Sequence, residues 1–155
     1  MFGSVRARVG YLVARRLFHW AWLVKQPRAW DWMQGQFARM AARGDAGVQS
    51  FYGHLLLFRG QGLSARQEGL RLLQLAATAG DGKAAYQLGV VSLAGDLQQP
   101  ADAAVAAAWW VKAARAGHPL AARRLAGLYA QGGAGLAVDP QQAALYEARA
   151  TELGL

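Results

Sequence analysis

The feature that most constrains this 155-residue chain is an internal repeat. Glycines at positions 44, 80, 117 and 154 are 36, 37 and 37 residues apart, and similar sequences follow the first three of them. These segments read GDAGVQSFYGHLLLFRGQG, GDGKAAYQLGVVSLAGDLQ and GHPLAARRLAGLYAQGGAG. A fixed period of this length is typical of proteins in which one short supersecondary unit stacks on the next.

Each unit is expected to contain two helices. Apolar residues at helical spacing fill two stretches per unit, and a turn that contains glycine separates the two stretches. Small residues recur at one place in the second stretch, at Gly69, Ala106 and Ala143, where they allow a neighbouring helix to approach closely. One helix pair cannot bury its apolar face alone, but stacked pairs share a continuous core. The sequence therefore predicts an all-α fold, an α-solenoid of about three helix-turn-helix repeats with an N-terminal helical extension.

The predicted organisation has three parts. They are a basic, aromatic N-terminal helix (1–26), a partial repeat that caps the solenoid (27–43) and the three repeats (44–155, divided as 44–79, 80–116 and 117–154). Because Pro27 interrupts the helical pattern, the first two helices are expected at about 5–25 and 28–43.

The glycine-rich stretch YAQGGAGLAVDP at 129–140 could be a phosphate-binding loop or a turn. Its glycines follow a helical pattern and not a strand, and no Lys-Ser/Thr pair follows them. Val138 also stands where a G-x-G-x-x-G motif requires its last glycine. Glycine recurs at this place in the other units, and Asp139-Pro140 is a typical helix start. The stretch is therefore interpreted as a turn.

A longer motif runs through the units: small-x-x-x-Leu-Gly-x-x-Tyr, then Gly-x-Gly, Asp-x-x-x-Ala and a closing Ala-Ala-x-x-Gly. The third unit carries it at Ala121, Leu125, Ala126, Tyr129, Gly133, Gly135, Asp139 and Ala143. The middle unit carries it at Ala84, Leu88, Gly89, Asp102, Ala106, Trp109, Ala113, Ala114 and Gly117. The first unit departs most, with Val48, Leu56 and Ala65 at motif positions, and the middle unit has Ser92 in place of the tyrosine.

In this motif the chain resembles the Sel-one-like repeat (SLR) family, a relative of the tetratricopeptide repeat. The resemblance covers residues 44–154. It implies a non-catalytic binding scaffold or adaptor, as in bacterial and eukaryotic members, and it implies no particular ligand.

The residues themselves offer little for catalysis. The chain has no cysteine, which removes thiolate metal sites and a cysteine nucleophile. His19, His54 and His118 do not share the spacing that would place two of them on one helical face for a metal. His118, just before a proline, is interpreted as a solvated turn residue, and the aspartates at unit starts are interpreted as helix caps. We therefore expect no enzyme activity, no catalytic residues, no metal and no cofactor.

The concave surface formed by the first helices is the predicted site for a protein or peptide partner. Helical phase places eight residues there that do not belong to the packing set: His54, Phe58, Lys83, Tyr86, Val90, Leu120, Arg123 and Gln131. Their mixture of aromatic, aliphatic and basic groups suits an extended or helical peptide with some acidic character. In the second helix of the middle unit, Trp109 is expected in the core and Trp110 towards the outer surface.

The N-terminal part invites an alternative prediction. Residues 1–44 carry eight basic residues and one acidic residue, which gives +7, whereas 45–155 carry nine and eight, which gives +1. A basic helix with aromatic residues suits an anionic membrane surface. The candidate residues are Arg8, Arg15, Arg16, Trp20, Trp22 and Lys25. Equally, Leu17–Val24 could pack on the first repeat and leave the arginines solvated.

The apolar run Leu17–Val24 has eight residues, against about 20 for a membrane-spanning helix. No small-x-small cleavage site follows it closely, which argues against a cleaved signal peptide. We therefore expect a cytoplasmic protein, peripheral to the inner membrane if the N-terminal helix binds lipid. No basic stripe runs along the repeats and no nucleic-acid-binding motif is present, so a nucleic-acid partner is disfavoured.

Overall fold

The structure, a computed structural model, describes residues 2–20, 22 and 25–155. The described helices are α1 (Phe2–Leu17), α3 (Pro27–Ala41), α4 (Ala46–Arg59), α5 (Gly62–Thr78), α6 (Gly82–Ala94), α7 (Ala103–Arg115), α8 (Pro119–Gln131) and α9 (Pro140–Glu152). The β-structure of the described residues is one isolated bridge between Gly133 and Leu136. None of the helices in this part of the chain is both long and apolar enough to cross a membrane.

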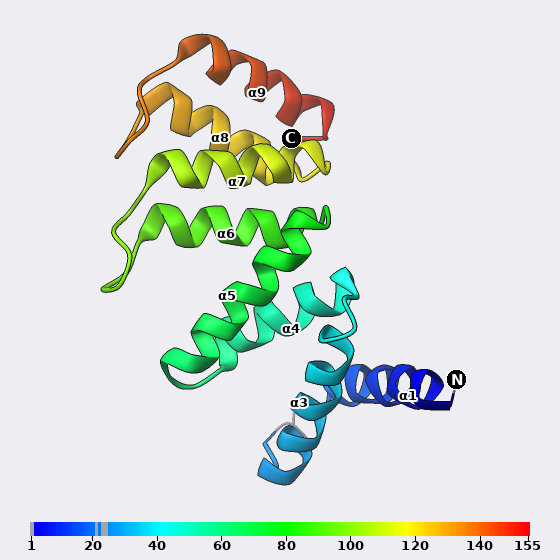
Figure 1. The fold of residues 1–155 in the computed structure, drawn as a ribbon. Coiled ribbons are helices and arrows are strands. Elements are labelled where there is room, and N and C mark those ends of the chain that lie inside the picture. The colour runs from blue at the N-terminus through cyan, green and yellow to red at the C-terminus, as the bar shows by residue number, and fades with distance from the viewer. Residues whose placement is uncertain (1, 21, 23–24) are drawn as a thin grey trace.

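Helices pair in sequence order and the pairs stack (Figure 1). The three repeats are α4 with α5, α6 with α7, and α8 with α9, and each second helix packs on the first helix of the next repeat. This arrangement confirms the predicted all-α solenoid.

The glycines that set the repeat period end the second helices. Gly44, Gly80, Gly117 and Gly154 all have positive φ, between 83° and 100°, which residues with a Cβ rarely adopt. At Gly80 the backbone N–H donates to the Ala77 carbonyl, and the next N–H, of Asp81, donates to the Ala76 carbonyl. This Schellman pattern ends the helix and turns the chain into the next first helix. The period of the sequence is therefore the period of this turn.

The turns within the repeats also require glycine. Gly95 after α6 and Gly132 after α8 have φ values of 65° and 70°, and Gly135 has 74°. After this loop, the Asp139 side chain accepts hydrogen bonds from the backbone N–H groups of Gln141 and Gln142, with Pro140 as the first residue of α9. The stretch 129–140 is thus a helix–turn–helix connection, as expected, and not a loop between a strand and a helix.

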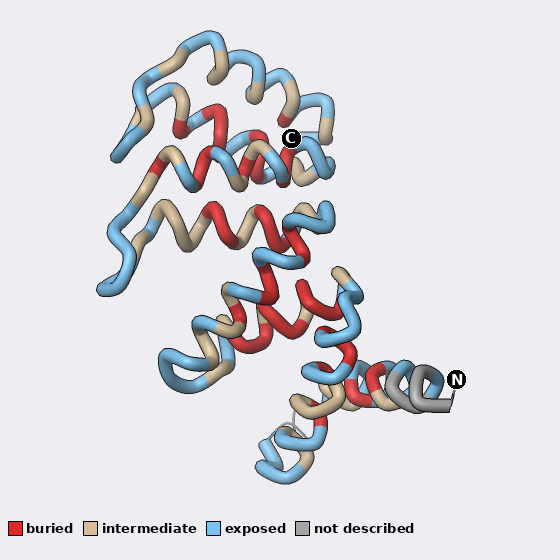
Figure 2. The backbone as a smooth tube through the Cα atoms, viewed as in Figure 1, coloured by how far each residue is buried: buried red, intermediate tan, exposed pale blue. Residues whose placement is uncertain are grey.

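The buried residues form two main clusters, and α5 contributes to both (Figure 2). Leu72 belongs to the cluster that includes residues of α1, α3 and α4, whereas Leu73 belongs to the cluster that includes residues of α6, α7 and α8. Small residues bring helices close together inside these clusters. A Cβ at Gly53 would lie 3.0 Å from the Gly69 carbonyl oxygen, and a Cβ at Gly69 would lie 2.9 Å from the Gly53 carbonyl oxygen. These two glycines let α4 and α5 pack backbone to backbone.

One expectation about the N-terminal part needs correction. The first helix ends at Leu17 and not near residue 25, because Trp20 donates to the Leu17 carbonyl in a tighter turn. Residues 21, 23 and 24, which the sequence placed in that helix, lie outside the described residues. The second helix begins at Pro27 itself, which sits in the first turn where no backbone donor is needed.

Candidate functional site

The first helices of the repeats begin in the same way, and this aligns their exposed residues. The side chains of Asp45, Asp81 and His118 accept hydrogen bonds from the backbone N–H three residues on, which caps α4, α6 and α8. Caps of this kind satisfy donors that the first turn of a helix leaves unpaired. We call the surface formed by the exposed sides of α4, α6 and α8 the first-helix face.

Two hollows lie along the first-helix face. The first, the α1–α4–α6 hollow, has about 530 Å³ of space and is lined by Tyr11, Arg15, Asp45, Gly47, Val48, Ser50, Phe51, His54, Asp81 and Lys83. The second, the α6–α8 hollow, has about 670 Å³ and is lined by Gly80, Asp81, Gly82, Lys83, Ala116, Gly117, His118, Pro119 and Leu120. Both hollows are lined by Asp81 and Lys83, so they lie next to each other at the start of α6. We call the two hollows together the track.

Asp81 holds this junction together. One carboxylate oxygen accepts from the Ala84 backbone N–H at 2.7 Å and from the Ser50 hydroxyl at 3.0 Å. Ser50 belongs to α4, so the bond links the first repeat to the second. The backbone N–H of Asp81 also closes the preceding α5 turn. One residue therefore ends a helix, starts the next and fixes two repeats relative to each other.

An aromatic stack borders the α6–α8 hollow. The Tyr86 ring lies 4.5 Å from the His118 ring at an interplanar angle of 11° and 6.4 Å from the Trp110 ring. The Arg124 guanidinium carbon lies 5.6 Å from the Tyr86 ring centroid and 6.0 Å from that of Trp110. Cation–π contacts of this length hold the guanidinium over the rings. Tyr86 and His118 are partly exposed beside the track, whereas Trp110 lies beneath them in the core.

The interpretation of His118 as a solvated turn residue was wrong. It is half-buried and caps α8, with Nδ1 accepting from the Ala121 backbone N–H at 3.3 Å. Burial lowers the pKa of His118, and the nearby Lys83 ammonium lowers it further, against the opposite effect of Asp81. The cap needs a neutral ring with the proton on Nε2, because a protonated imidazole has no acceptor. Alignment of the repeats could have revealed this cap, because His118 stands where the other repeats have aspartate.

Only some of the eight residues predicted on the concave face line the track. Lys83 and Leu120 line the track, and His54 lines its first hollow while stacking on the exposed Phe58 at 6.3 Å. The others are Tyr86 in the aromatic stack, exposed Arg123 and Gln131, and Val90, which is half-buried against the core. Val90 has little surface left for a partner.

Trp110 was predicted towards the outer surface, but it is buried in the core. It is 1% exposed and lies against Gly89, with its indole N–H donating to the Tyr86 carbonyl at 3.1 Å. Its neighbour Trp109 is half-buried, with the Lys112 ammonium 4.8 Å from its ring. The two residues are 100° apart on α7, and the gap left by Gly89 on α6 decides which of them enters the core.

The predicted membrane residues fall into two groups. Arg8, Arg16, Trp20, Trp22 and Lys25 are exposed, with Trp20 at 62% and Trp22 at 68%. Arg15 is different because it lines the α1–α4–α6 hollow, with its guanidinium carbon 5.8 Å from the Phe51 ring. Tyr11 lies one turn before Arg15 on the same side of α1 and lines the same hollow, where it meets Phe37 of α3 edge to face. Ala14 is buried in the same cluster. Sequence reasoning missed that α1 reaches the track.

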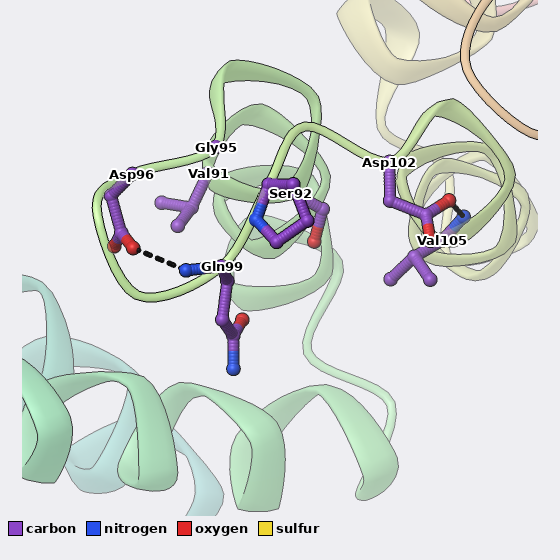
Figure 3. A pocket seen from close by; sticks show the side chains of 8 residues that line it. Val91, Ser92, Gly95, Asp96, Gln99, Asp102 and Val105 are labelled. Atoms are coloured by element: carbon purple, nitrogen blue, oxygen red, sulfur yellow. Dashed lines mark hydrogen bonds between the residues drawn. The ribbon is translucent and has the colours of Figure 1, made fainter.

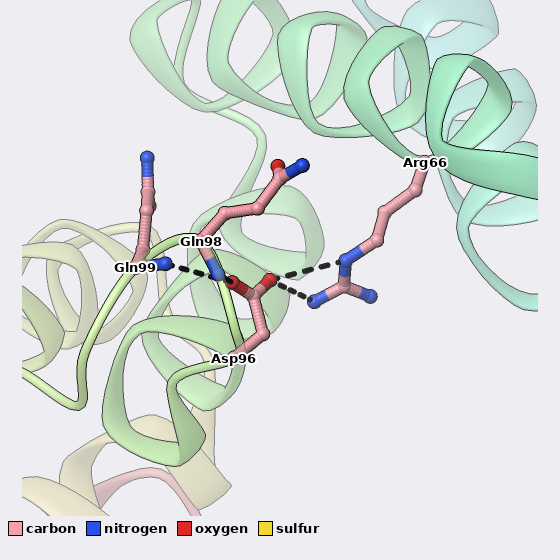
Figure 4. Close-up of polar contacts among 4 residues, drawn as sticks. All are labelled: Arg66, Asp96, Gln98 and Gln99. Carbon is pink, nitrogen blue, oxygen red and sulfur yellow. Dashed lines mark hydrogen bonds and ion pairs between the residues drawn. The ribbon is translucent and has the colours of Figure 1, made fainter.

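Another hollow, of about 240 Å³, lies at the connection between α6 and α7 (Figure 3). Its polar groups are occupied by the turn itself. The Asp96 carboxylate accepts from the backbone N–H groups of Gln98 and Gln99 and from the guanidinium of Arg66 on α5 (Figure 4). The two backbone donors and Arg66 hold the pKa of Asp96 below its usual value. This hollow is a structural feature of the turn.

The described residues contain no group of three or more His, Cys, Asp or Glu side chains that could hold a metal ion. The capping aspartates and Asp96 accept hydrogen bonds from backbone N–H groups, and His54 contacts the Ser50 carbonyl through Nδ1. The groups that the first-helix face leaves accessible are its partly exposed aromatic rings and its cations.

Comparison with known proteins agrees with this architecture. Among solved structures, an antigen of uropathogenic Escherichia coli (c5321) described as displaying an SLR fold is 25% identical with a TM-score of 0.67, over 79% of this chain and 26% of its own. A Sel1 repeat protein from Oxalobacter formigenes is 24% identical with a TM-score of 0.64, over 76% and 88%. The chain thus spans about a quarter of the antigen. Comparison with curated proteins gave no match.

The Sel1 repeat family model matches this chain three times in succession. The matches cover residues 47–81, 82–118 and 119–155, so each includes one first helix and one second helix. Together with the stacked helix pairs and the Schellman glycines at the ends of the second helices, these matches show that the chain belongs to the Sel1 repeat family.

Proposed function

We propose that this protein is a scaffold that binds a partner protein along the first-helix face. Sel1 repeat proteins are generally non-enzymatic protein–protein interaction scaffolds. The observation that carries the proposal is the track of two hollows that share Asp81 and Lys83. It includes residues of all three repeats, and it combines half-buried aromatic surface with the exposed cations Arg15 and Lys83. Aromatic residues and arginine are enriched at protein interfaces.

Site-specific photo-crosslinking tests this proposal. A benzoylphenylalanine replaces Leu120, which lies on the track and is 46% exposed. The matched control position is Leu75, which is 43% exposed but lies on the second helix α5. We expect one discrete protein adduct from position 120 and none of that mass from position 75. The proposal fails if both positions give the same adduct, or if position 75 alone gives one.

Arg123 supplies the second arm of the same experiment. It is exposed on α8, so Arg123→Glu should reverse a charge at the face without disturbing the core. The control is Arg28→Glu, which makes the same change at an exposed position of α3. Arg123→Glu should remove the adduct at position 120, and Arg28→Glu should leave it in place.

A specific observation also favours attachment of α1 to an anionic membrane surface as a second function. The side of α1 that faces away from α3 exposes Val5, Val9 and Leu12, which are 62%, 53% and 62% accessible. Arg8 and Arg16 lie among them, and Trp20 and Trp22 are exposed beyond the end of the helix. Apolar side chains interleaved with cations match the requirements of an interfacial helix.

Vesicle flotation tests this second function. Vesicles with phosphatidylserine should carry the full chain upward, and vesicles of phosphatidylcholine alone should not. Leu12→Glu should abolish flotation because it places a carboxylate in the apolar part of the helix surface. Deletion of 1–26 is a poor test, since it would uncover the buried Phe37. Flotation that Leu12→Glu leaves unchanged would refute the attachment of α1.

A further inference from the structure

The two helix layers of the solenoid differ in charge. The first helices, together with α1, carry eight basic residues and no acidic one: four in α1, one in α4, one in α6 and two in α8. The second helices, together with α3, carry seven basic and four acidic residues. The excess of positive charge is therefore concentrated in one layer, and not only in the N-terminal part of the chain.

Ion pairing increases this difference. Three ion pairs occur among the described residues, Arg66–Asp96, Arg71–Glu68 and Arg149–Glu152, and every member lies on a second helix or on the α6–α7 connection. The two carboxylates on the track, Asp45 and Asp81, cap α4 and α6. A carboxylate at a helix N-terminus is partly neutralised by the helix dipole. The cations of the first-helix layer thus outnumber its carboxylates. Arg8, Arg15, Arg16, Arg59, Lys83, Arg123 and Arg124, the cations of this layer whose side chains the structure describes, take no part in these three ion pairs.

Arg15 connects α1 to this layer. It lines the α1–α4–α6 hollow together with His54 and Lys83, and its guanidinium faces the Phe51 ring. Its neighbour Arg16 is also exposed but does not line the hollow. Lys83 lies in the first turn of α6, where the helix dipole disfavours a cation and favours an anion beside it.

We propose that the partner segment held by the track is an acidic, extended stretch of polypeptide, and that α1 is part of its binding site through Arg15. This inference rests on the proposed function, because it names the chemistry of the partner on the same face. Carboxylates of the segment lie against Arg15, Lys83 and Arg123, and its apolar side chains lie against Phe51 and the Tyr86–His118 stack. Complementary charge of this kind sets specificity and association rate.

The experiment begins with a random 12-residue peptide library displayed on phage and selected on the full chain. Selected peptides should be enriched in Asp and Glu. One of them, labelled with fluorescein, then serves as the probe in anisotropy titrations at two salt concentrations. We expect Arg15→Glu and Lys83→Glu each to weaken binding by about 10-fold, and the loss should shrink at high salt. Arg16→Glu, the matched control on the same helix, should change binding by less than about 2-fold.

The outcomes separate this inference from the function on which it rests. Peptides without acidic enrichment, or equal effects of Arg15→Glu and Arg16→Glu, would overturn the inference. If Arg123→Glu still lowered the affinity for peptides without acidic enrichment, the proposed binding to the first-helix face would still be supported. A 20-nucleotide single strand that binds more tightly than the peptides would assign the cations to nucleic acid and overturn the inference as well. Circular dichroism melts of every variant show that its fold is intact before binding is compared.

Discussion

Gly89 on α6 and Trp110 on α7 form a close interhelical contact in the middle repeat. A Cβ added at Gly89 would lie 2.9 Å from Trp110 Cε2 and closer still to Nε1 and Cδ1, which are ring atoms of a buried side chain. Real Cβ atoms do not approach other atoms so closely, so Gly89→Ala must move either the ring or a helix. It also threatens the indole hydrogen bond to the Tyr86 carbonyl.

The size of the effect follows from three contributions. Overpacking a core costs about 1–3 kcal/mol, and a weakened hydrogen bond costs about 1 kcal/mol. Replacement of a glycine within a helix by alanine returns about 1 kcal/mol. We therefore expect Gly89→Ala to reduce the free energy of unfolding by about 2 kcal/mol, a value within the range of these terms. Gly127 on α8 is the matched control, because a Cβ there meets nothing within 4 Å. Gly127→Ala should stabilise the protein by about 0.5–1 kcal/mol.

Urea unfolding followed by circular dichroism measures the free energy of unfolding of both variants. We expect Gly89→Ala to lower the urea midpoint of unfolding and Gly127→Ala to raise it. If Gly89→Ala were as stable as the wild type, or stabilised it as Gly127→Ala should, the close contact between α6 and α7 would be wrong.

Four further changes test other parts of the structure. Gly117→Ala should destabilise by about 1–2 kcal/mol in the same urea assay, because Gly117 has a φ of 86°. Ser50→Ala should cost about 1 kcal/mol, because it removes the hydroxyl that joins the first two repeats through Asp81. Trp110→Ala should cost about 3–5 kcal/mol by unfolding titration, as expected for a fully buried ring. Because the pKa of His118 is lowered in the folded protein, its contribution to the free energy of unfolding is complete above about pH 6.5 and is lost as pH falls through the folded pKa. His118→Asn keeps a cap but does not titrate, so urea titrations of this variant over the same pH range should lack this loss.

The sequence predicted the fold well because the repeat period records a backbone requirement. The glycines at 44, 80, 117 and 154 have positive φ in every turn, so their spacing alone divides the chain into helix pairs. The aspartate caps follow from the same alignment. These features depend on local geometry, which the order of residues encodes directly.

Contacts between helices were harder to predict from the sequence. Helical phase could not decide between Trp109 and Trp110, because the answer depends on the space that Gly89 leaves on another helix. The same holds for Arg15, whose place beside His54 and Lys83 depends on how α1 crosses α3 and α4. The cap formed by His118 could have been found, since the register of the repeats aligns it with Asp45 and Asp81.

Hydrogen–deuterium exchange of the chain with and without a display-selected peptide locates the bound peptide, because it reads every segment at once. We expect slower exchange in the first helices α4, α6 and α8 and near the end of α1, with α5, α7 and α9 unchanged. Protection confined to the second helices, or spread evenly over both layers, would contradict binding at the first-helix face.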